Sequence, residues 1–131
     1  FICLDTNRYN FEKIILKKII EKKIDIIFLA GFMRILSKRF VRIFKGKIVN
    51  IHPSLLPKFK GLNTFQRVLN SKEKYTGCTV HYVDEKLDNG RIILKRKISI
   101  SNKDNITTLK KKVQFEEYKA YSNAIRKIFQ I

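Results

Sequence analysis

Ile24-Asp-Ile-Ile-Phe-Leu-Ala30 is a short apolar run that ends at Gly31. An apolar run of this length, closed by a glycine, is typical of a strand that is covered on both faces, as in a parallel sheet. A second run, Lys47-Ile-Val-Asn-Ile51, follows Gly46 and predicts another strand. The two runs therefore indicate the sheet of an α/β fold.

Helical spacing surrounds these two strands. Apolar residues recur at helical intervals from about Asn10 to Lys23, and Ser37 is the predicted cap of a short helix through Phe44. Short links between such helices and strands indicate a right-handed α/β winding. Farther along, we predict a helix over residues 64–71, strands over 78–83 and 92–100, and a long helix over 106–129.

Composition limits the class of protein. The chain has 131 residues, 44% of them hydrophobic, so we expect one folded domain at most. Its 29 Lys and Arg against 11 Asp and Glu give a formal net charge of +18, which is typical of proteins that bind nucleic acid or anionic membranes. The basic residues are dispersed along the chain, however, so a polyanionic partner is the lesser alternative and we expect the charge to attract anionic substrates.

Other absences indicate the compartment. No apolar run is long enough to span a bilayer, and no segment resembles a secretory signal. Cys3 and Cys78 do not have metal-type spacing, and no cluster of His, Cys and Asp has the spacing of metal ligands. We therefore predict a cytoplasmic protein with reduced thiols, with no metal and no membrane attachment.

Asn50 and His52 are candidate catalytic residues. They lie two apart at the end of a predicted strand, so their side chains project to the same side, and Pro53 restricts His52 to an extended backbone. In open α/β sheets, ligands bind beyond the carboxyl ends of the strands. An amide beside an imidazole suits a carbonyl oxygen that becomes negative. The structural alternative is that both side chains only hold the proline-rich loop.

Asp88 lies in Leu87-Asp-Asn-Gly90, a turn-forming segment between two predicted strands. The plain interpretation is a turn. The functional one has the carboxylate facing His52, where it orients the imidazole and favours its protonated form. For His81, in the middle of a predicted strand, we favour a hydrogen-bonded structural role.

Several segments, in this order, resemble one known family: Leu29–Leu36, Asn50–Pro57, Gly61, Gly77–His81 and Leu87–Gly90. The family is that of the folate-dependent formyltransferases, which share Asn-x-His-x-Ser-Leu-Leu-Pro. Together with Ala-Gly-Phe-Met-Arg-Ile-Leu, this motif resembles the phosphoribosylglycinamide formyltransferase branch of the family.

This resemblance implies a fold, a reaction and a set of residues. The fold is the Rossmann-like formyltransferase fold, with a mostly parallel central sheet flanked by helices. The reaction is formyl transfer from 10-formyltetrahydrofolate to the amine of glycinamide ribonucleotide in purine biosynthesis, by a monomer or homodimer. The implied catalytic residues are Asn50, His52 and Asp88. Folate binding is implied for Arg8, Met33, Arg34, Ile35, Leu36, Asn50, Asp84, Glu85, Lys86, Leu87 and Asp88. Ribonucleotide binding is implied for Gln114 and Glu117, with exposed helix residues as the even alternative.

The sequence also departs from the family pattern. It begins at Phe1 and lacks the N-terminal strand and the Gly-Ser-Asn phosphate loop, so we expect residues 1–131 to be an N-terminally truncated, incomplete catalytic domain. Residues 26–30 and Val49 would then lose sheet neighbours and expose apolar surface. We expect such a fragment to be poorly soluble and nearly inactive. Smaller departures are Lys60, Asn63 and Arg91, where the family has proline, often histidine, and proline.

Other functions remain as alternatives. Formyltetrahydrofolate hydrolase shares the three catalytic residues and uses water in place of the amine. An inactive remnant of the transferase is the non-enzymatic alternative. A methionyl-tRNA formyltransferase would carry a further domain, and an RNA-binding module would need an aromatic and basic sheet that this sequence does not show.

Overall fold

The structure, a computed structural model, describes residues 7–131. Its elements in chain order are α1 (Arg8–Glu21), β1 (Ile27–Leu29), α2 (Lys38–Ile43), β2 (Ile48–His52), α3 (Thr64–Asn70), β3 (Tyr75–Tyr82), β4 (Ile92–Ser99) and α4 (Ile106–Phe129). Every predicted helix and strand is present, with ends that shift by a few residues. The largest shifts are in the strands: β1 is shorter than its apolar run, and β3 begins before the predicted Cys78.

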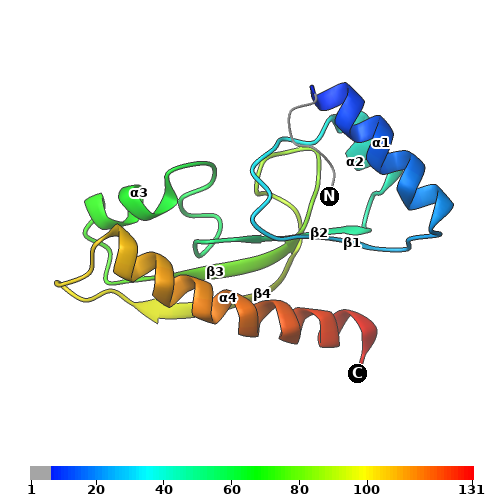
Figure 1. Cartoon of the computed structure of the whole chain (residues 1–131). Coiled ribbons are helices and arrows are strands. Elements are labelled where there is room, and N and C mark those ends of the chain that lie inside the picture. The colour runs from blue at the N-terminus through cyan, green and yellow to red at the C-terminus, as the bar shows by residue number, and fades with distance from the viewer. Residues whose placement is uncertain (1–6) are drawn as a thin grey trace.

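The strands form one sheet in the order β1-β2-β3-β4 (Figure 1). β1 and β2 are parallel, and α2 provides the crossover that a parallel pair requires. β3 pairs antiparallel with both β2 and β4. The predicted α/β class with flanking helices is confirmed, and the described sheet is mixed. Residues 83–91 are too few for a parallel crossover, which accounts for the antiparallel pairing of β3 with β4.

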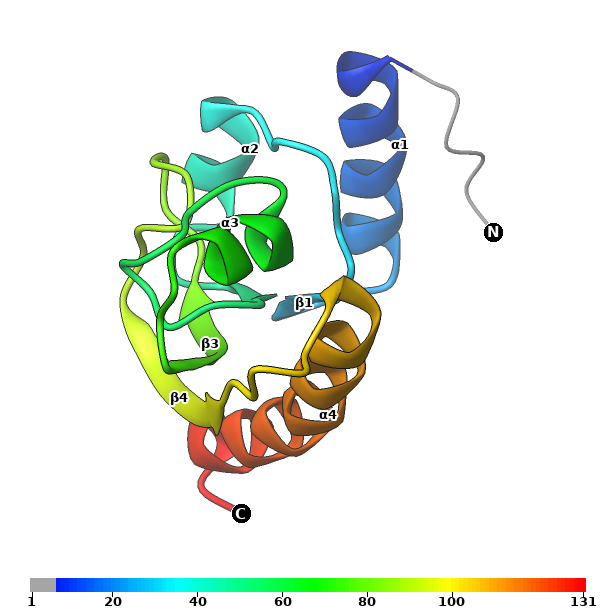
Figure 2. The ribbon, with the colours of Figure 1, turned by 90° about the vertical axis from the view of Figure 1, so that its left-hand side faces the viewer.

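Helices cover both faces of the sheet (Figure 2). α1 and α2 lie on one face, where Ile19 and Phe40 pack with Ile48 of β2. α4 lies on the other face, where Leu109 and Val113 pack with Val49 of β2. Neighbouring residues of β2 thus point into different clusters, as the alternation of a strand requires.

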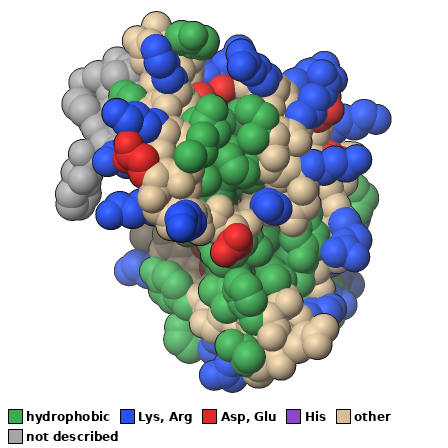
Figure 3. Space-filling view, turned by 90° about the vertical axis from the view of Figure 1, so that its right-hand side faces the viewer, with side chains coloured by type: hydrophobic (Ala, Val, Ile, Leu, Met, Phe, Trp, Pro, Cys, Tyr) green, Lys and Arg blue, Asp and Glu red, His purple; other side chains and the backbone are tan. Residues whose placement is uncertain are grey.

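The expected exposure of the sheet is found at β1 and not at Val49. Within residues 7–131, β1 has one sheet neighbour, and its three residues are half-buried. Val49 is fully buried, because it packs under α4, so the prediction for this residue was wrong. Apolar side chains are exposed near this edge, among them Ile20 and Ile24, and Figure 3 shows such side chains gathered among Lys and Arg.

α4 has the bounds that the sequence predicted, and its start has a clear cause. The side chain of Asn105 accepts a hydrogen bond from the backbone N–H of Thr108, while the Thr108 hydroxyl accepts one from the N–H of Asn105. This reciprocal capping satisfies two donors that a helix start leaves unpaired. Farther along, the hydroxyl of Tyr121 reaches the backbone of β1 and β2.

Candidate active site

The site begins on β2, on the face of the sheet that α1 and α2 cover. Asn50 is paired with His81 of β3, and His52 with Thr79, in the antiparallel register. Side chains of directly opposed residues lie on the same face, so these four residues form one polar group. Asn50 is half-buried and the other three are buried.

Asp88 lies beside His52, as the functional interpretation predicted. Its Oδ2 is 3.4 Å from Nδ1 of His52, and both side chains are 8% exposed. The same oxygen accepts a 2.8 Å hydrogen bond from the N–H of Gly61. On the far side of the imidazole, Nε2 is 2.8 Å from the carbonyl oxygen of Phe59. Both ring nitrogens therefore face oxygen acceptors, and a ring with a proton on each nitrogen would donate to both.

His81 is also part of this group. Its Nδ1 lies 2.9 Å from the carbonyl oxygen of Tyr82, so Nδ1 carries the proton. Its Nε2 is buried, has no hydrogen-bond partner among the described residues, and lies 3.9 Å from Oδ1 of Asp88. Burial is the main cause that lowers the pKa of His81 below its ordinary value, so the ring is neutral. A neutral Nε2 offers a buried acceptor beside the Asp88 carboxylate.

The proline-rich loop after His52 is held by a hydroxyl that the sequence analysis did not single out. Thr79 Oγ1 donates to the carbonyl of Ser54 at 2.7 Å and accepts from the N–H of Leu56 at 3.0 Å. The loop also lies close to β3: a Cβ on Gly77 would be 2.8 Å from Leu55 and 1.9 Å from the carbonyl oxygen of Arg96. Position 77 therefore has no room for a side chain.

The backbone of the site is unusual at three positions. Asp88 has a φ of 47°, Phe59 of 56° and Gly61 of 83°, all in the left-handed region. Aspartate and glycine tolerate this conformation, whereas for phenylalanine it is strained. The loop then passes close to β3 at Gly90, where a Cβ would be 1.7 Å from the carbonyl oxygen of Tyr82. Position 90 therefore has no room for a side chain.

The predicted folate wall, Met33 to Leu36, follows β1. Met33 is 77% exposed and Ile35 66% exposed, while Arg34 and Leu36 are half-buried. The guanidinium of Arg34 lies 4.8 Å from the ring centre of Phe11, which places α1 against this wall. An alternating exposure of this kind leaves apolar side chains free for a ligand.

α1 also holds the end of the wall. The Glu12 carboxylate accepts hydrogen bonds from both the N–H and the hydroxyl of Ser37, the N-cap residue of α2. Arg8 is exposed at the first residue of α1. Phe11 and Glu12, which follow Arg8 on α1, are therefore structural, whereas Arg8 is exposed to solvent.

The predicted opposite wall is the loop of residues 84–88. Asp84 accepts hydrogen bonds from the N–H of Lys86 and from the side chain of Asn89, which closes the turn. The exposed Glu85 receives a paired hydrogen bond from Arg42 of α2, at 2.7 and 2.9 Å. That hydrogen bond lowers the pKa of Glu85, so its carboxylate is charged and ties the loop to α2. Leu87 is 56% exposed.

Gln114 and Glu117 lie on α4, across the sheet from the side chains of Asn50 and His52. Gln114 is exposed, and Glu117 is half-buried. Burial raises the pKa of Glu117 above its ordinary value. The described structure brings Asn50, His52 and Asp88 together, and it does not bring Gln114 or Glu117 against them.

Sequence reasoning missed the backbone groups of the site, the carbonyl of Phe59 and the N–H of Gly61. It also missed the loop contacts of Arg42 and Thr79. Of these groups, only Gly61 could have been noticed in the sequence, since a glycine in a polar loop indicates that backbone groups approach each other closely there.

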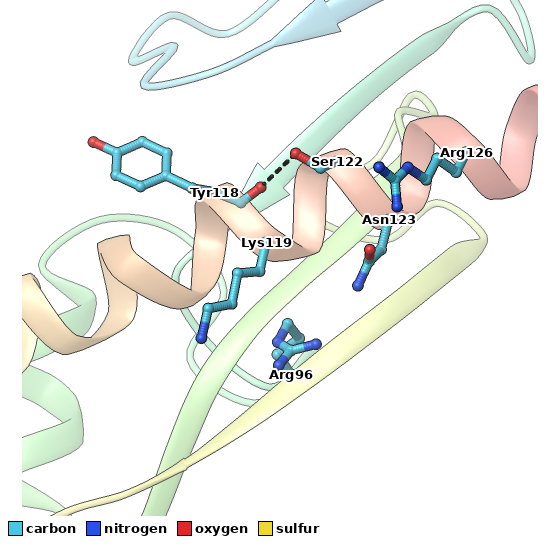
Figure 4. Close-up of a pocket in the computed structure, with 6 residues that line it drawn as sticks. All are labelled: Arg96, Tyr118, Lys119, Ser122, Asn123 and Arg126. Carbon is cyan, nitrogen blue, oxygen red and sulfur yellow. Dashed lines mark hydrogen bonds between the residues drawn. The ribbon is translucent and has the colours of Figure 1, made fainter. Parts of the chain in front are cut away.

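A separate hollow of about 520 Å³ lies between α4 and β4, away from His52. Figure 4 shows its lining, which is polar and basic: Arg96, Tyr118, Lys119, Ser122, Asn123 and Arg126. Two of its cations, Arg96 and Lys119, are paired with Glu116. Cys78, the register partner of Arg96, belongs to the core cluster under α4, so this hollow lies on the face of the sheet opposite to the side chain of His52.

Two features are absent from the described part of the chain. No helix of residues 7–131 is long and apolar enough to cross a membrane. The same residues contain no group of three or more His, Cys, Asp and Glu side chains that is placed to hold a metal ion. Cys78 is a buried free thiol, and Cys3 lies outside the described residues.

Comparison with known proteins identifies the family of this chain. A profile described as "Formyl transferase" matches residues 5–125. The trifunctional purine biosynthetic protein adenosine-3 of Bos taurus is 46% identical over 92% of this chain and 12% of its own length. Phosphoribosylglycinamide formyltransferase of Haemophilus influenzae is 45% identical over 79% of this chain and 49% of its own length.

Solved structures show the same similarity. Phosphoribosylglycinamide formyltransferase of Anaplasma phagocytophilum has a TM-score of 0.88 at 38% identity, over 90% of this chain and 58% of its own. The Brucella melitensis enzyme has a TM-score of 0.86 at 42% identity, over 94% of this chain and 63% of its own. The chain belongs to the formyl transferase family. It spans about half the length of the Haemophilus influenzae relative.

Proposed function

We propose that the protein transfers a formyl group from 10-formyltetrahydrofolate to the amine of glycinamide ribonucleotide. The observation that carries the proposal is the buried contact between Asp88 and His52. His52 lies on β2, the strand that also holds Asn50. Relatives that match most of this chain are named for that enzyme or for a trifunctional purine biosynthetic protein. The action would be that of a cytoplasmic monomer or homodimer on two small molecules.

In the proposed reaction the substrate amine attacks the formyl carbon, so a C–N bond forms and the carbonyl electrons move to oxygen. The amide of Asn50 and the imidazole of His52 would donate hydrogen bonds to this oxyanion. Nε2 of His52 now faces the carbonyl of Phe59 at 2.8 Å. The oxyanion would replace that carbonyl as the acceptor, which requires a small movement of the Phe59 loop.

The remaining steps move one proton. The attacking nitrogen must lose a proton, and the folate nitrogen must gain one as the bond from the formyl carbon to it breaks. Asp88 would order the water that carries this proton. The buried Nε2 of His81 lies 3.9 Å from Oδ1 of Asp88, so a small movement of the loop of residues 84–88 would let it accept a hydrogen bond from the same water.

The binding roles follow the walls of the site. Met33, Arg34, Ile35 and Leu36 on one side, and residues 84–88 on the other, would enclose the folate ring. Arg8 is exposed at the start of α1, and its guanidinium suits a carboxylate on the folate tail. Gln114 and Glu117 on α4 would bind the ribonucleotide. No residue role in this scheme requires a metal.

The test is tetrahydrofolate release from 10-formyltetrahydrofolate by the natural-length protein, with and without glycinamide ribonucleotide. We expect release only when the ribonucleotide is present. Release in its absence would replace the transferase with a hydrolase. No release in either case, with a folded protein, would indicate an inactive remnant.

A further inference from the structure

The side chain of Tyr121 joins three elements at the edge of the candidate site. Its hydroxyl lies 2.6 Å from the carbonyl oxygen of Leu29, the last residue of β1. It also lies 3.0 Å from the carbonyl oxygen of Val49, the residue before Asn50 on β2. One hydroxyl on α4 thus lies between the backbones of two neighbouring strands.

The chemistry of Tyr121 makes this contact a fixed one. Its ring packs edge-on against Phe28 of β1, with centres 5.8 Å apart and an angle of 72° between the planes. Burial raises the pKa of Tyr121, so the hydroxyl stays protonated and remains a donor. Carbonyl oxygens only accept, so the single proton is shared between Leu29 and Val49.

The two carbonyls lead to different parts of the site. Leu29 is followed by Ala30 and Gly31 and then by the folate wall that begins at Met33. Val49 is followed by Asn50, whose register partner on β1 is Leu29. A shift of one strand end against the other would therefore move the folate wall relative to the Asn50 amide.

The position of Tyr121 on α4 also relates it to the residues proposed to bind the second substrate, the ribonucleotide. Gln114, Glu117 and Tyr121 are three and four residues apart, so they follow one side of the helix. The side of α4 that would bind the ribonucleotide is thus the side that Tyr121 fastens to β1 and β2.

We propose that Tyr121 is a positioning residue that sets the distance between the formyl donor and the acceptor amine, by holding α4 to the ends of β1 and β2. The inference rests on the proposed transferase function. Its effect is on alignment and not on the bonds that form, since Tyr121 contacts backbone that precedes the site. Small errors of alignment lower the rate of a two-substrate reaction strongly, by up to about a hundredfold for 1 Å.

The test compares Tyr121→Phe with Tyr118→Phe in the natural-length protein. Tyr118 is a matched control, because it is on the same helix and is 73% exposed. The first measurement is amide hydrogen exchange of residues 30–36 without ligands. We expect exchange at least severalfold faster in Tyr121→Phe and unchanged in Tyr118→Phe. Unchanged exchange in Tyr121→Phe overturns the inference, whether or not the protein is a transferase.

The second measurement is the product ratio, formylated ribonucleotide against free formate, at saturating substrates. We expect Tyr121→Phe to lower kcat about tenfold, to change each KM less than twofold, and to raise the share of formate, because water reaches a misaligned formyl group. A loss of folded protein alone lowers both products equally, so an unchanged ratio overturns the positioning role. If the wild type transfers nothing, the proposed function fails, and hydrogen exchange still decides whether Tyr121 fixes the strand ends.

Discussion

Nδ1 of His52 lies 3.4 Å from Oδ2 of Asp88, across the gap between the end of β2 and the loop before β4. The two residues are 36 positions apart in the chain, as their numbers show, and both are almost fully buried. Burying a carboxylate beside an imidazole costs desolvation free energy unless hydrogen bonds compensate for the lost water. Gly61 supplies the hydrogen bond to the carboxylate.

Asp88→Asn should lower kcat by orders of magnitude and leave folate binding nearly unchanged. Asparagine keeps the shape and tolerates the left-handed backbone at position 88, so the change removes mainly the charge. Steady-state kinetics and a folate-binding titration provide the measurement. Asp25→Asn, an exposed position, is the control. Near-wild-type turnover in Asp88→Asn would remove the carboxylate from the mechanism.

Asn50→Ala should lower kcat by about a hundredfold or more, as the loss of one oxyanion donor does in other enzymes. The half-buried side chain lies beside His81 in the sheet register, so a small loss of stability is also expected. The rate must therefore be normalised to folded protein. A mild kinetic effect with a clear loss of stability would make Asn50 a structural residue.

Glu85→Gln should weaken the tie between the loop of residues 84–88 and α2. The ion pair with Arg42 is exposed, so we expect little change in global stability. The KM for the folate should rise severalfold while kcat changes little, because the wall is less ordered before binding. The KM should rise with salt in both proteins, because a basic chain attracts an anionic folate, and it should rise more steeply in the wild type, which also loses the ion pair. A salt dependence equal in both proteins would contradict this role of the ion pair.

Thr79→Val should destabilise the protein by about 1–3 kcal/mol, because the N–H of Leu56 and the carbonyl of Ser54 lose their buried partner. Thermal unfolding measures this loss. Thr107→Val, at an exposed position of α4, is the control for the same chemical change. Equal shifts of Tm in the two variants would show that the hydroxyl of Thr79 does not hold the loop.

Stability should fall as the pH drops below about 6.5, the ordinary pKa of histidine. The pKa of His81 is lowered in the folded state, so below this pH the unfolded chain binds more protons than the folded one. The stability that the neutral ring provides is thus present above pH 6.5 and is lost toward the lower folded-state pKa. Urea unfolding from pH 5 to 8 measures the slope. His81→Gln should flatten it, and an unchanged slope would assign the effect to other groups.

The sequence predicted most of the fold because its signals are local. Apolar runs and helical spacing located every element, and the bounds of α4 agree with the prediction. The direction of β3 was not predicted, because residues 53–74 before it are long enough for a parallel or an antiparallel connection. Val49 was wrongly expected to be exposed, since its burial comes from α4, which is far away in the chain.

The candidate site was only partly predictable. Alternation placed Asn50 and His52 on one side, and the structure agrees through the register with His81 and Thr79. The approach of Asp88 depends on how the loop folds back, for which no spacing rule exists. Lys60, a departure from the family pattern, donates to the side chain of Asn89 at 3.1 Å and so links the two loops. The spacing of residues in a sequence does not predict a contact between two loops of this kind.

The left-handed backbone of Phe59 has a consequence for the engineering of this protein. A non-glycine residue in this conformation costs about 1–2 kcal/mol, and here its carbonyl oxygen is the group that faces His52. Glycine at position 59 would relieve this cost, but it would also remove a half-buried ring that packs against the main core cluster and would add chain entropy to the unfolded state. The net effect of that change is a loss of stability, together with a looser loop beside His52. Engineering for thermal stability should therefore leave Phe59 unchanged and substitute other positions.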